Sequence, residues 1–185
     1  MIWILIGLIA AILIVIIIIY NGLVAKRLMS DNGWSDITVQ LKRRADLIPQ
    51  IVETVKAYAK HEKSLFIDVI EKRNAALAAG DDPSQRGVSE SALARPVSKL
   101  IALKEDYPDL KAAQNFLDLQ NELTDTEDKI EMARRFYNGA VREQNVAVQS
   151  FPANLIASMF GFSSRDFFEI EMGDRANPEL DFSDS

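Results

Sequence analysis

The chain has no cysteine and only one histidine. Without cysteine it can form no disulfide, and it offers no thiolate to a zinc ion, an iron–sulfur cluster or a substrate. A single histidine cannot build a histidine-rich metal site, and a histidine-dependent triad would have to rest on it alone. His61 and Glu62 begin a zinc-protease pattern, but Leu65 stands where the second histidine would be needed. The sequence therefore predicts no metal, no cofactor and no catalytic residues.

Glycine and proline are scarce as well, with 8 and 6 copies in 185 residues. Such a composition disfavours an all-β fold, which needs many turns. Acidic residues outnumber basic ones by 27 to 21, which gives a net charge of −6. Domains that bind nucleic acid are usually basic. The sequence therefore predicts a helical protein without a nucleic-acid partner.

Charge is absent from the first 25 residues, and residues 2–20 read IWILIGLIAAILIVIIIIY. About 20 such residues cross a bilayer as a helix. A cleaved signal peptide is the alternative, but no basic region precedes the run, which exceeds the usual length of about 7–15 residues. We therefore predict a transmembrane anchor over residues 1–25. Lys26 and Arg27 follow it, which favours a single pass with the N-terminus outside and the bundle in the cytoplasm.

The rest of the chain shows helical periodicity, with apolar residues recurring every three or four positions. We predict helices over residues 47–79, 89–106 and 109–150, with a kink or a new start at Pro49 and a break at Asn32-Gly33. The predicted fold is all-α, an N-terminal transmembrane helix followed by an antiparallel bundle of three to four long helices. The bundle is expected over residues 26–173, and residues 174–185 form a predicted acidic, disordered tail.

Four polar residues fall on or beside the apolar stripes of these helices. A charge buried in a helix seam is costly unless it is paired. One interpretation is an interior polar network that sets the helix register or holds a ligand. The alternative is that the side chains extend to solvent at the edge of the stripe. The four residues are Glu62, Arg73, Thr126 and Arg134.

A basic triplet, Lys42-Arg43-Arg44, follows the anchor. Basic residues near a membrane gain about 1 kcal/mol each from anionic headgroups. The triplet is therefore a candidate lipid contact, and a solvated helix surface that reinforces the topology is the alternative.

Five phenylalanines gather after the longest predicted helix. They are candidates for contact with a protein partner or with the bilayer. The alternative is that they cover the open end of the bundle. The five are Phe151, Phe160, Phe162, Phe167 and Phe168.

Several stretches resemble a known family. WSDITVQLKRR at residues 34–44, DLIP at 46–49 and VKAYAKHE at 55–62 are similar to the first conserved block of the LemA family. YPDLKA at 107–112 resembles its second block, which runs on to Tyr137-Asn138, and Phe151-Pro152 and Gly161-Phe162 resemble its last. Ala45 departs from the pattern, which often has an aromatic residue there. The resemblance implies a bacterial membrane protein with one N-terminal span and an antiparallel helical bundle, and it implies no catalytic residues.

The function expected from these features is a non-enzymatic scaffold or interaction module at the bacterial inner membrane. The membrane is one expected partner. A protein partner is expected as well, either a second copy of this chain or a different, unidentified protein. One alternative is an accessory of a membrane stress-response or lipid-sensing system. Another is a metal-dependent protein that uses the polar residues inside the bundle, but an enzyme needs several perturbed groups around one pocket.

Overall fold

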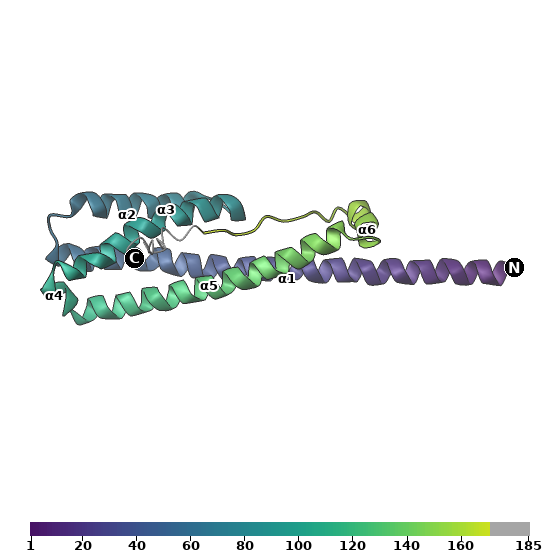
Figure 1. Ribbon diagram of the computed structural model, residues 1–185, viewed down its shortest axis with the longest axis horizontal. Coiled ribbons are helices and arrows are strands. Elements are labelled where there is room, and N and C mark those ends of the chain that lie inside the picture. The colour runs from purple at the N-terminus through teal and green to yellow at the C-terminus, as the bar shows by residue number, and fades with distance from the viewer. Residues whose placement is uncertain (171–185) are drawn as a thin grey trace, which may run out of the picture. The chain divides into compact units, whose positions relative to one another are not determined.

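The computed structural model describes residues 1–170, and almost all of them are helical (Figure 1). Within these residues no β-strand occurs, so the predicted all-α fold is confirmed. The predicted tail, residues 174–185, lies outside the described residues. The elements are α1 (Ile2–Tyr58), α2 (Lys63–Ala78), α3 (Pro83–Ala102), the 3-10 helix η1 (Leu103–Glu105), α4 (Pro108–Lys111), α5 (Gln114–Gln149) and α6 (Ala153–Phe160).

Helix α1 contains the apolar run and continues to Tyr58 without interruption. By length and composition it can cross a membrane, and no other helix in the described chain meets that test. The break predicted at Asn32-Gly33 is wrong. A Cβ on Gly33 would lie only 3.0 Å from the Phe136 ring and 3.1 Å from the Tyr137 Cα. Gly33 therefore lies inside a helix and not in a turn. Its missing side chain lets α5 approach α1 closely.

The chain divides into two compact units. The first unit comprises residues 1–41 and 126–168, and the second comprises residues 42–125 and the chain from 169 onward. Helices α1 and α5 are each divided between the units, with one segment in the first unit and the other in the second.

The second unit contains the larger apolar core, to which α1, α2, α3 and α5 each contribute buried side chains. Helices α2 and α3 lie side by side (Figure 1). The main core residues are Ile48, Ile51, Val52 and Val55 from α1, Phe66, Val69 and Ala76 from α2, Leu93, Val97 and Leu100 from α3, and Phe116 and Leu123 from α5.

The helix predicted over residues 47–79 is two helices, because α1 ends at Tyr58 and α2 begins at Lys63. Val55 and Phe66 lie on either side of this break, and both are buried in the same core. Two helices that bury one face in a common core continue the same apolar spacing across a turn, so the pattern did not reveal the break.

Two further boundaries differ from the prediction. Helix α3 begins at Pro83, where the Asp82 carboxylate accepts a hydrogen bond of 2.9 Å from the Gln85 N–H and caps the helix. The helix predicted over residues 109–150 is interrupted between α4 and α5, and Leu110 of α4 is fully buried in the core.

In the first unit α5 runs antiparallel to α1. Lys26 of α1 pairs with Glu143 at 2.8 Å, and further along α1 the Trp34 ring lies 5.5 Å from that of Tyr137. Helix α6 then packs Ile156 and Ala157 against Leu23. The chain returns in an extended segment, residues 162–168, which we call the C-terminal strap (Figure 1).

Candidate functional site

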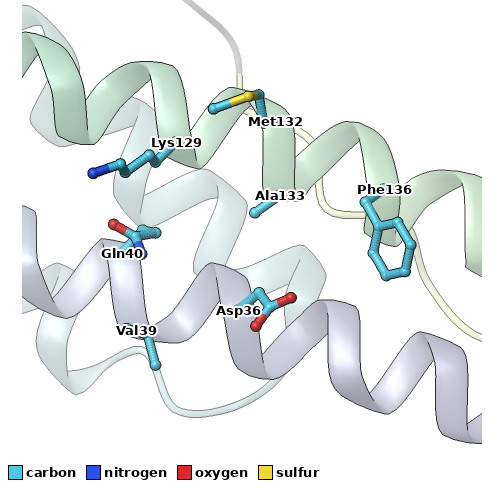
Figure 2. Close-up of a pocket in the computed structure, with 7 residues that line it drawn as sticks. All are labelled: Asp36, Val39, Gln40, Lys129, Met132, Ala133 and Phe136. Carbon is cyan, nitrogen blue, oxygen red and sulfur yellow. The ribbon is translucent and has the colours of Figure 1, made fainter.

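An open groove lies between α1 and α5 in the first unit and encloses about 360 Å³. Figure 2 shows Ala133 and Phe136 of α5 directed towards α1, with Asp36 and Gln40 of α1 on the opposite side. Its rim includes apolar side chains that stay in solvent, since Val39 is 59% exposed and Met132 is 61% exposed. The seven lining residues are Asp36, Val39, Gln40, Lys129, Met132, Ala133 and Phe136.

Gln40 gives this groove a polar feature. Its Oε1 is buried and has no hydrogen-bond partner within the described part of the chain. A buried acceptor without a donor is destabilising, so a group that brings an N–H or O–H to it would be favoured. Asp36 and Lys129 add one charge of each sign. The groove can therefore receive an apolar side chain together with one hydrogen-bond donor, between charges of both signs.

The second unit holds a buried ionic cluster that the sequence pattern did not predict. The Glu90 carboxylate receives a hydrogen bond from Arg44 and one of 2.9 Å from Nε of Arg86. Arg44 and Glu90 are each only 2% exposed. Two arginines around one carboxylate compensate the cost of burying its charge. Glu90 and Arg86 are four residues apart on α3, a spacing that marks them as neighbours, but their burial has no signal in the local pattern.

The basic triplet is divided by the fold. Lys42 is exposed and pairs with Asp46 at 3.1 Å, and Arg43 pairs with Glu122 at 2.9 Å. Arg44 belongs to the buried cluster, so a lipid contact by its guanidinium does not fit its position. Lys42 and Arg43 remain candidates for headgroup contact.

The four polar residues on the stripes lie on α2 and α5 or at the start of α2. Arg73 donates from Nε to the Ala45 carbonyl of α1 at 2.7 Å. Glu62 lies half-buried at the start of α2. Thr126 is fully buried in α5, where Arg134 is half-buried two turns further on.

Side-chain amides of α5 hold the backbone of the C-terminal strap. Asn138 accepts from the Phe168 N–H and donates to its carbonyl, both at 3.0 Å. Asn145 makes the same two bonds with Arg165, at 2.8 and 2.9 Å. The two asparagines are seven residues apart and therefore lie on one face of α5. The amides thus take the place of a neighbouring strand and keep residues 165 and 168 in fixed register on α5.

The five phenylalanines fall into two groups. Phe168 is fully buried beside Trp34, and Phe162 is 9% exposed. Phe151 and Phe160 are 81% and 51% exposed, and Phe167 is 38% exposed. Phe162 and Phe168 therefore act as core residues, whereas the exposed members remain candidates for contact with a partner or the bilayer.

No group of three or more His, Asp or Glu side chains within residues 1–170 is placed to hold a metal ion.

The chain is similar in sequence to three magnetosome proteins. The chain is 23% identical over 174 residues to the magnetosome protein MamQ of Magnetospirillum gryphiswaldense. It is 22% identical over 175 residues to magnetosome proteins MamQ 1 and MamQ 2 of Paramagnetospirillum magneticum. These matches cover 80–81% of the chain but 64% of the length of each relative. The LemA family model matches residues 33–182, which include the groove, the buried ionic cluster and the strap, and the chain therefore belongs to the LemA family.

Proposed function

We propose that this protein is a non-enzymatic scaffold of the bacterial inner membrane that binds an apolar segment of a protein partner in the groove between α1 and α5. The observation that carries this proposal is the groove itself, in which Val39 and Met132 expose apolar surface beside the buried Gln40 acceptor. The ligand that fits best is an amphipathic segment with a large aliphatic side chain and a nearby N–H or O–H donor.

The anchor holds this groove close to the membrane. Val39 follows Tyr20 by 19 residues on the continuous helix α1. At 1.5 Å per residue the groove lies about 30 Å beyond the apolar run along the helix. A partner bound there would be held near the membrane surface, as expected for a scaffold. The basic residues after the run favour the cytoplasmic side for it.

Site-specific photocrosslinking in intact cells tests this function. A photoreactive residue replaces Val39, and a second variant carries it at Val88, which is 73% exposed on α3. We expect a discrete protein adduct at position 39 that disappears when Met132→Lys is added, with no such adduct at position 88. Adducts that are equal at both positions, or that persist with Met132→Lys, would contradict the proposal. Two differently tagged copies distinguish self-association from a different partner.

A further inference from the structure

A second stretch without acidic or basic side chains runs from residue 144 to residue 164. It comprises the end of α5, the helix α6 and the start of the C-terminal strap. The first stretch, residues 1–25, is the apolar run of α1 with its short continuation. The two stretches belong to the same unit of the structure.

The charged residues that bound these stretches meet one another. Lys26, the first charge after the apolar run, pairs with Glu143, the last charge before the second stretch, at 2.8 Å. The hydrogen bond from Lys26 and its positive charge hold the pKa of the Glu143 carboxyl below its ordinary value. Arg165, the first charge after the second stretch, pairs with Asp31. These two ion pairs therefore lie at the level of residues 26–31 of α1. Between this level and Met1, neither α1 nor the second stretch carries an acidic or basic side chain.

Helix α6 lies against the apolar run. Pro152, Leu155 and Ile156 border an entirely apolar pocket of about 280 Å³ whose other wall is formed by residues 11–19 of α1. Residue 19 is seven residues before Lys26, and residue 11 is fifteen before it. These positions lie about 10 and 22 Å from the level of the charges along the helix. With the level of the charges placed at the surface of a hydrocarbon core about 30 Å thick, both positions would lie within the core.

The outer surface of α6 is apolar too. Leu155 is 57% exposed, Met159 72% and Phe160 51%. The hydroxyl of Ser158 donates to the Leu155 carbonyl at 3.0 Å, so it does not require water. At the end of α6 the Phe160 ring packs against that of Tyr20, with 4.9 Å between the ring centroids. Tyr20 is an aromatic residue at the end of the apolar run. An apolar helix that continues the lipid-facing surface of a transmembrane helix fits the hydrocarbon core of a bilayer.

We propose that α6 is a second membrane-inserted element, which enters the bilayer from the side of the bundle, lies against the anchor and leaves again through the strap. Gly161, with a φ of 72°, makes the turn out of the helix. The apolar pocket between α6 and α1 receives a lipid acyl chain. This inference concerns α6 and the bilayer and does not depend on the groove or its partner.

Spin labelling of the full-length protein in phospholipid nanodiscs tests this proposal, because the chain has no native cysteine to compete for the label. Single-cysteine variants Leu155→Cys and Met159→Cys carry the nitroxide. Ile12→Cys, 51% exposed in the apolar run, serves as the membrane benchmark, and Val88→Cys as the aqueous one. Circular dichroism checks that each labelled variant keeps the parent helicity.

We expect labels at 155 and 159 to collide more with oxygen than with a water-soluble nickel chelate, as the label at 12 does. The label at 88 should show the opposite preference. A preference for nickel at 155 and 159 would overturn the proposal, because α6 would then lie in water. Low accessibility to both reagents would overturn it as well, because a second protein surface would then cover α6.

Discussion

Arg73 of α2 occupies a hydrogen-bonding position that Pro49 leaves open on α1. Proline has no N–H, so the carbonyl of Ala45, four residues earlier, lacks its helical donor. Nε of Arg73 donates to this carbonyl at 2.7 Å. The polar residue on an apolar stripe and the proline inside a long helix, which are separate irregularities in the sequence, therefore compensate each other in the fold.

The pairing of Arg73 with the Ala45 carbonyl predicts energetic coupling to Pro49. Arg73→Met should lower the free energy of unfolding by about 1.5–3 kcal/mol, because it removes a hydrogen bond from a charged donor. In a Pro49→Ala background the restored helical N–H should reduce that loss by at least about 0.5 kcal/mol. Urea denaturation of the four proteins of the cycle measures the coupling. Arg95→Met, at an exposed position of α3, is the control. Equal losses in both backgrounds would show that Arg73 does not replace the missing donor.

The amide of Asn138 predicts how the C-terminal strap is held. Asn138→Ala leaves the Phe168 N–H and carbonyl without their partner, which should cost about 1–3 kcal/mol. Hydrogen exchange should show the Phe168 amide losing its protection, while amides in the middle of α3 keep theirs. Asn121→Ala removes an exposed asparagine of the same helix and should change neither quantity. Unchanged protection of the Phe168 amide in the Asn138 variant would show that Asn138 does not hold the C-terminal strap.

Gly87 and Gly139 form a matched pair of helical glycines with opposite expected effects. A Cβ on Gly87 would lie 2.2 Å from the backbone oxygen of Glu169, so Gly87→Ala must displace one of the two segments and should lower the melting temperature. Nothing lies within 4 Å of a Cβ on Gly139. Gly139→Ala should therefore stabilise the protein by about 0.5–1 kcal/mol, through the higher helix propensity of alanine. Thermal melts that place both variants on the same side of the parent would refute this interpretation.

Glu90 is predicted to be far more important for stability than an exposed carboxylate. Glu90→Ala leaves the buried guanidinium of Arg44 and that of Arg86 without their shared carboxylate and should cost about 3–5 kcal/mol. Glu53→Ala disrupts an exposed pair with Lys56 and should cost about 0–1 kcal/mol. Chemical denaturation of the two variants provides the comparison. Similar losses at the two positions would mean that the cluster does not support the core.

The helix cap at Asp82 predicts a stability effect that depends on pH. The hydrogen bond from the Gln85 N–H, assisted by that from Ser84, lowers the pKa of the Asp82 carboxyl from its ordinary value of 3.8. A lowered pKa stabilises the folded state above the ordinary value, and the stabilisation is lost as the pH falls through the lowered pKa. Asp82→Ala should therefore melt below the parent at neutral pH, and the gap should narrow as the pH falls below 3.8. Asp81→Ala, which removes the adjacent carboxylate outside the cap, serves as the control variant.

The sequence by itself was sufficient for features that depend on local composition and periodicity. The charge-free run of residues 1–25 and the three- and four-residue apolar spacing establish a long N-terminal apolar helix and an all-α fold. Motifs such as WSDITVQLKRR point to the family, because they combine polar and apolar identities at fixed spacing. Each of these features can be recognised without knowing which other segment a residue will contact.

Only the tertiary structure decided the roles of individual polar residues and some helix ends. Arg44 and Lys42 are equivalent in a basic triplet, yet one is buried against Glu90 and the other is exposed, because only the packing of α3 distinguishes their faces. The pair Asn32-Gly33 is typical of turns, but Gly33 lies inside α1, where the approach of α5 requires a residue without a side chain. Periodicity shows which face of a helix is apolar, whereas the long-range contact determines which partner covers it and which polar group that partner satisfies.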